Sequence, residues 1–82
     1  MFKFELISPD KKIKEYKGKE LSLLFSEFCD NLQRTSAKSV FRLHLKDGKT
    51  KDIILYPVRV RRLLNNKIAR MLFEKRLKLM HG

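Results

Sequence analysis

Apolar and polar residues alternate from the first residues of the chain. Apolar side chains occupy every second position of "MFKFELIS": Phe2, Phe4 and Leu6. This period of two is typical of a strand with one buried face. Pro9 and Asp10 follow it and suit the central positions of a tight turn. The segment "IKEYKG", which ends at Gly18, then predicts a return strand, so the first eighteen residues predict a β-hairpin.

The period changes to that of a helix in "KELSLLFSEFCDNLQ". Its apolar residues are spaced three or four positions apart: Leu21, Leu24, Phe25, Phe28 and Leu32. This spacing places them on one face of an α-helix. The segment "TSAKS" is the expected connector to the next element.

A second hairpin is predicted by "VFRLHLKDGKTKDIILYP". Phe41, Leu43 and Leu45 alternate with the polar residues Arg42, His44 and Lys46. Asp47 and Gly48 tolerate positive φ and predict a type I′ turn. The return strand is expected from Thr50 to Tyr56, ending near Pro57, which has no N–H for a sheet hydrogen bond.

The last third of the chain predicts a helix, beginning at Arg61 or already at Pro57. Asn65-Asn66 could divide it, because asparagine is a poor interior residue and a good N-cap. On one helical wheel the main apolar stripe consists of Leu63, Leu64, Ile68, Met71, Leu72 and Leu79. A second stripe, Phe73, Leu77 and Met80, falls nearly opposite. It could cover another part of the sheet, bind a protein partner or form a homodimer, and it is the candidate protein interface. Residues 79–82 are expected to fray.

Together these elements predict a single α+β domain over residues 1–82 in the order β-β-α-β-β-α. Two hairpins would form one antiparallel sheet, with both helices packed on one face. The predicted core takes its members from every element: Phe2, Phe4, Leu6, Leu24, Phe25, Phe28, Leu32, Phe41, Leu43, Leu45, Ile53, Leu55, Leu64, Ile68, Met71 and Leu72.

The net charge of the chain indicates what kind of partner the domain binds. The 82 residues carry 20 Lys and Arg against 9 Asp and Glu, a net charge of +11. With 43% hydrophobic residues and six Phe, the chain has enough apolar surface to fold. A folded domain with such an excess of positive charge attracts polyanions, of which nucleic acid is the commonest.

The excess is concentrated after Pro57, where Glu74 is the only acidic residue. The candidate phosphate-binding residues in this segment are Arg59, Arg61, Arg62, Lys67, Arg70, Lys75, Arg76 and Lys78. Three further candidates surround the second hairpin turn: Lys46, Lys49 and Lys51. Tyr16 and Tyr56 could stack on bases if they faced solvent, although we expect little from them.

Other chemistry has weaker support. Cys29, His44 and His81 are not spaced as metal ligands, and Cys29 is interpreted as a small, semi-buried hydrophobe, so neither a metal nor another cofactor is expected. His44 with Ser39 is one example of a conceivable catalytic pair, but nothing in the sequence points to it. We therefore expect a protein that is not an enzyme and has no small-molecule substrate, with a motif-less small ribonuclease as the enzymatic alternative. One cysteine and the lack of a long apolar run favour a cytoplasmic protein.

The leading hypothesis is a small basic protein that binds DNA or RNA through its C-terminal helical segment. The alternative is a regulatory protein that docks on an acidic surface of a larger protein, such as transcription or replication machinery, through Phe73, Leu77 and Met80. Membrane-surface binding is disfavoured, because the apolar residues of the helix are assigned to the core.

Overall fold

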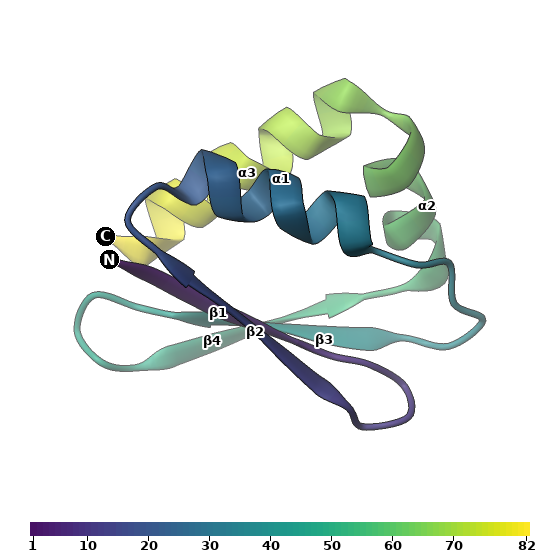
Figure 1. Ribbon diagram of the computed structural model, residues 1–82, viewed down its shortest axis with the longest axis horizontal. Helices are drawn as coiled ribbons and strands as arrows, with labels where there is room; N and C mark the ends of the chain where they lie inside the picture. The colour runs from purple at the N-terminus through teal and green to yellow at the C-terminus, as the bar shows by residue number, and fades with distance from the viewer.

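Two antiparallel hairpins form one four-stranded sheet with the strand order β2-β1-β3-β4. The computed structural model describes residues 1–82. Its elements are β1 (Phe2–Ile7), β2 (Ile13–Gly18), α1 (Leu21–Asn31), β3 (Ser39–His44), β4 (Thr50–Leu55), α2 (Pro57–Asn65) and α3 (Lys67–His81). All three helices cover one face of the sheet and leave the other face open (Figure 1). The predicted α+β class and the two-hairpin antiparallel sheet are therefore confirmed, with the last helical segment divided into α2 and α3.

The two hairpin turns share one geometry, a type I turn followed by a residue with positive φ, Lys11 at 67° and Gly48 at 88°. In the β1–β2 turn, Lys11 donates its N–H to the carbonyl of Ser8 at 2.8 Å, which puts Pro9 and Asp10 at the central positions as predicted. In the β3–β4 turn the predicted type I′ geometry is wrong. Gly48 has a φ of 88° but Asp47 does not share a positive φ, whereas type I′ requires one at both central residues.

The β3–β4 connection is instead a three-residue loop. Gly48 donates its N–H to the carbonyl of Leu45 at 3.1 Å, and Leu45 donates to the carbonyl of Lys49 at 2.7 Å. These bonds make Lys46 and Asp47 the central pair, with Gly48 following in the left-handed region, the usual pattern of a type I turn with a bulge. Asp47 Oδ1 also accepts from the N–H of Lys49 at 2.9 Å.

The core between the sheet and the helices is rich in aromatic rings. Phe4 stacks on Phe41 and on Tyr16, with centroids 4.8 and 5.1 Å apart. Phe28 from α1 meets these rings edge-on, a favoured geometry for aromatic pairs. The full buried apolar set is Phe4, Tyr16, Leu21, Phe25, Phe28, Cys29, Leu32, Phe41, Leu43, Ile53, Leu55, Val60, Leu63, Phe73 and Leu77.

The break between α2 and α3 falls at Asn66. Its side chain accepts hydrogen bonds from the N–H groups of Ile68 and Ala69 at 2.9 and 3.2 Å. An asparagine oxygen that satisfies these otherwise unpaired donors is the usual start of a new helix. The division that Asn65-Asn66 suggested is present, and α3 begins there with its own helical phase.

This new phase overturns the predicted orientation of the last helix. Phe73 and Leu77 are buried and Met80 is packed against the core, so the predicted partner stripe belongs to the interior. Leu63 and Leu64 of the expected core stripe are in or against the core, but its α3 members lie outside: Ile68, Met71, Leu72 and Leu79 are each at least 60% exposed. The physical reason is that the helix stops at Asn66 and restarts at a different angle. The prediction assumed one continuous helical phase across this residue.

The C-terminal end is held against the sheet, although residues 79–82 were expected to fray. The N–H of Lys46 donates to the carbonyl of His81 at 3.2 Å, and the His81 ring lies 4.5 Å from the ring of Phe2. The two chain ends consequently lie side by side (Figure 1).

Candidate nucleic-acid interface

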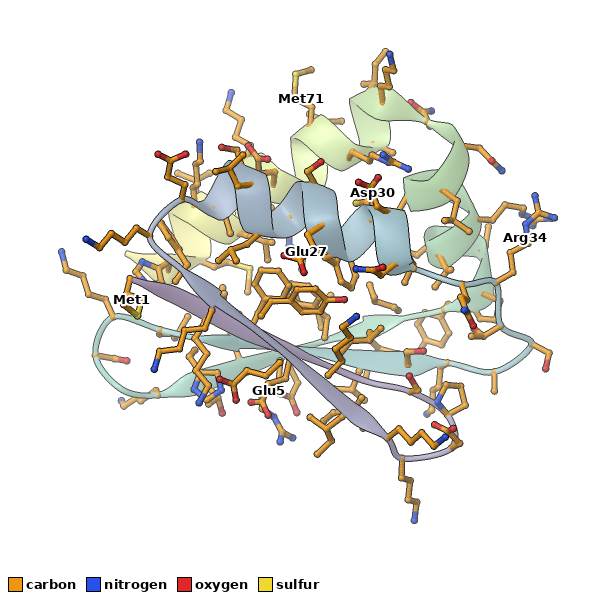
Figure 2. All side chains as sticks on the ribbon, viewed as in Figure 1. Met1, Glu5, Glu27, Asp30, Arg34 and Met71 are labelled. Atoms are coloured by element: carbon orange, nitrogen blue, oxygen red, sulfur yellow. The ribbon has the colours of Figure 1, made fainter.

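The open face of the sheet is balanced in charge. Cross-strand registers place its residues in three rows: Lys17–Lys3–His44–Thr50, Glu15–Glu5–Arg42–Asp52 and Ile13–Ile7–Val40–Ile54. Three Lys and Arg residues therefore face three carboxylates. Several of these groups pair directly, among them His44 Nε2 with Glu5 Oε1 at 2.5 Å, and Glu5 extends below the sheet (Figure 2). This face contributes nothing to the net positive charge of the protein.

The helical layer on the other side is divided by charge. Helix α1 contains no Lys or Arg, and it carries Glu27 and Asp30 (Figure 2). Helices α2 and α3 hold eight Lys and Arg residues and only Glu74 as an acid. A polyanion is therefore repelled from α1 and attracted to α2 and α3.

Three arginines converge where α2, α3 and the end of β4 meet. Arg59, Arg62 and Arg76 line a hollow of about 440 Å³ and also a smaller one beside it. We call the larger space the arginine hollow, and its wall consists of Asp52, Ile53, Ile54, Tyr56, Val58, Arg59, Arg62 and Arg76. None of the three arginines forms an ion pair with a carboxylate.

The surroundings keep these positive charges uncompensated. Arg59 lies over the ring of Phe73, with its guanidinium carbon 5.8 Å from the centroid, so an aromatic face rather than an acid supports it. Asp52 is the only acid in the wall, and Arg42 binds it through Nε–Oδ1 at 2.8 Å and Nη2–Oδ2 at 3.1 Å. That bidentate hydrogen bond lowers the pKa of Asp52. The Asp52 carboxylate is therefore paired with Arg42 on the open face and does not compensate the three arginines.

Arg70, predicted to bind phosphate, has a structural role. Its Nε donates to the carbonyl of Leu63, and its Nη2 donates to the carbonyl of Leu64 at 3.2 Å. These carbonyls end α2, where a helix leaves acceptors unpaired and a cation is favourable. Arg70 therefore joins α2 to α3, with its fork directed at the protein.

The remaining predicted cations are dispersed. Arg61, Lys67 and Lys75 are exposed on α2 and α3 and do not line the arginine hollow, while Lys78 pairs with Glu74 at 3.8 Å. Lys46, Lys49 and Lys51 belong to the opposite end of the sheet, beside the C-terminus of α3. None of these three lysines lines the arginine hollow.

The positions of the two tyrosines, and of Ser39 and His44, test the predicted base stacking and the conceivable catalytic pair. Tyr16 is buried, whereas Tyr56 is 56% exposed and belongs to the wall of the hollow. Ser39 is buried on the helix-covered face, paired with Leu55, and His44 lies on the open face of the same strand. Those two side chains cannot meet as a nucleophile and a base.

The sequence reading missed Ile54 and Val58 as parts of this surface. Both are exposed apolar residues that line the hollow with Tyr56. Ile54 alternates with the buried Ile53 and Leu55 of β4, and this alternation is the signal that could have revealed it, whereas Val58 lies in the first turn of α2.

Cys29 is buried, in agreement with its interpretation as a small hydrophobe. Its thiol is 1% exposed, and burial raises its pKa to about 11, which disfavours the reactive thiolate. No group of three or more His, Cys, Asp or Glu residues is placed to hold a metal ion. None of the helices has the length and apolar character needed to cross a membrane.

Comparison with known protein families, with characterised proteins and with solved structures gave no match.

Proposed function

We propose that this protein binds nucleic acid through the α2–α3 face, with Arg59, Arg62 and Arg76 as the principal phosphate contacts. The convergence of three unpaired arginines on one hollow is the observation that carries the proposal. A guanidinium presents a planar fork of donors that matches phosphate oxygens. The only acid in the wall, Asp52, is bound by Arg42, so the three free cations favour a ligand that brings its own negative charge.

The distribution of charge supports a located surface rather than a diffuse one. The open sheet face is neutral overall, and α1 is acidic, so a polyanion has one preferred side of the molecule. Exposed Arg61, Lys67 and Lys75 extend the positive potential along α2 and α3. Such a field raises the association rate and aligns the ligand before close contacts form.

The direct test is a fluorescence anisotropy titration against duplex DNA, single-stranded DNA and structured RNA at two salt concentrations. Each phosphate neutralised releases counterions, so affinity is expected to fall steeply between about 50 and 200 mM salt. Binding that barely changes over this range, or no binding to any of the three, would contradict the proposal.

A second candidate function has its own observation, the exposed apolar set on α3. Ile68, Met71, Leu72 and Leu79 point away from the core, with Lys75 among them, and Met71 projects from the outer side of the helix (Figure 2). Apolar residues with cations between them suit an acidic protein surface. The outer side of α3 carries cations in every copy, so pairing of two identical helices would oppose like charges.

This docking function differs from the predicted one in its anchor residues. Phe73 and Leu77 are part of the core and unavailable, so Ile68 and Met71 take their place. The variant I68Q/M71Q is expected to remain folded because both side chains are exposed, and neither residue lines the hollows that the three arginines share. Loss of binding to a synthetic acidic amphipathic peptide, with nucleic-acid affinity unchanged, would support docking. Equal binding of the peptide by the parent and variant would contradict it.

A further inference from the structure

Tyr56 places an aromatic ring beside the three free arginines. It is 56% exposed and lines the arginine hollow with Ile54 and Val58, which are 38% and 51% exposed. Tyr56 therefore presents an aromatic face between two exposed apolar side chains. The hollow thus has an apolar side and a cationic side.

The backbone holds Tyr56 in a fixed position. Its carbonyl accepts hydrogen bonds from the N–H groups of Arg59 and Val60 at 2.9 and 3.1 Å, which start α2. Pro57 follows and restricts Tyr56 to extended backbone, as its φ of −70° and ψ of 155° show. The backbone that carries the ring is thus ordered before a ligand stacks on it, which lowers the conformational cost of binding.

Aromatic stacking and phosphate binding together match one ligand class. We infer that the arginine hollow takes an unpaired nucleotide of a single-stranded nucleic acid, with its base on Tyr56 and its phosphates at Arg59, Arg62 and Arg76. This inference rests on the proposed function and specifies its substrate. A base offers its flat face to an aromatic ring only when it is not stacked within a duplex, and single-strand binders combine these same two kinds of contact.

The dimensions and charges agree with this ligand. The hollow of about 440 Å³ falls in the range of about 300–1,000 Å³ in which small ligands are bound. Asp52 also faces it, but Arg42 already holds that carboxylate. An acidic peptide would satisfy the arginines and leave the ring of Tyr56 without a specific partner, so a nucleotide uses more of the site.

Three variants of Tyr56 test the inference. Y56L removes the ring and keeps apolar bulk, Y56F keeps the ring, and Y56W introduces the only tryptophan of the chain as a fluorescent probe. The ligands are labelled oligothymidylate and oligouridylate of about 12 nucleotides, within the range of single-strand site sizes, and a duplex DNA of the same length. R62Q serves as the variant that removes a phosphate contact and leaves the ring.

Y56L is expected to weaken single-strand binding by roughly 5- to 150-fold, since a stacked base contributes about 1–3 kcal/mol. Y56F is expected to bind like the parent, and single strands are expected to quench the fluorescence of Y56W. Duplex affinity is expected to stay within about twofold in Y56L and to fall in R62Q. The two single strands show whether the ring discriminates RNA from DNA, and quenching with either one supports the inference.

The inference would be overturned if Y56L bound single strands as tightly as the parent, or lost duplex and single-strand affinity equally. A parent protein that binds the duplex and single strands, with no effect of Y56L, would leave the proposed function intact. Binding of neither ligand by the parent would refute the proposed function itself. Quenching of Y56W by an acidic peptide but by no oligonucleotide would assign the hollow to a protein ligand.

Discussion

Replacing Arg59, Arg62 and Arg76 by glutamine should reduce the salt dependence of nucleic-acid binding by a calculable amount. Each neutralised phosphate contributes about 0.7 to the slope of log K against log salt for single strands and about 0.9 for duplex DNA. Three lost contacts therefore lower the slope by about 2.1 or 2.7. Over a fourfold rise in salt, the parent should lose roughly 20- to 40-fold more affinity than the triple variant.

The assay is an anisotropy titration at four or more salt concentrations, with folding verified by circular dichroism and denaturation. A matched control removes three cations from the opposite edge of the sheet, as K11Q/K14Q/K17Q. Those lysines belong to β2 and its turn, and β2 is the edge strand farthest from β4. The control should change the slope by much less than the arginine variant. Equal changes in both variants would refute the reasoning, because net charge alone, and not a located site, would then govern binding.

Three further outcomes follow from the packing. F73A should destabilise the domain by about 3–5 kcal/mol, whereas L72A should cost less than about 0.5 kcal/mol, in chemical denaturation; similar values would contradict the orientation of α3. R70Q should lower the free energy of unfolding by about 1–3 kcal/mol, since it removes charged hydrogen bonds to the end of α2, and R70K should not restore it; an unchanged midpoint would exclude the cap. The Cys29 thiol, with its raised pKa and buried position, should react with an aromatic disulfide reagent near pH 8 only at the rate of unfolding, and rapid labelling of the folded protein would contradict its burial.

The sheet and the first helix could be predicted from sequence because each has one regular period and clear turn residues. Phe4, Phe41 and Leu43 alternate with polar residues and are buried as expected, and Phe25 and Phe28 form the buried face of α1. In these elements the local pattern and the tertiary packing agree, and under this condition a pattern of apolar residues predicts the structure.

The last segment could not be predicted to the same depth because its helical phase depends on one residue. Asn66 starts α3 afresh, and a wheel that ignores this restart exchanges the buried and exposed sides. Phe73 thus became an expected surface anchor and Ile68 an expected core residue, the reverse of their positions. The presence of a helix was encoded locally, while its rotation was set by packing on α1 and the sheet.

The candidate site shows a similar limit. The sequence correctly shows that the excess of positive charge lies after Pro57. It does not show which of the eight cations there are free to bind a ligand. Only the fold separates Arg70, directed at the end of α2, from Arg62 and Arg76, which share a hollow. Tyr56 likewise gains its significance from neighbours that are distant in sequence.

The most direct test of the central claim is a map of backbone amide shifts as a single-stranded oligonucleotide is added to isotopically labelled protein. The account predicts that shifts concentrate around Tyr56, Arg59, Arg62 and Arg76, at the junction of β4, α2 and α3. Amides on the neutral open face, such as those of Glu5 and His44, should remain nearly unchanged. Shifts that centre on the open face or on α1, or that spread evenly over all lysine-bearing segments, would contradict the claim that the arginine hollow is the binding site.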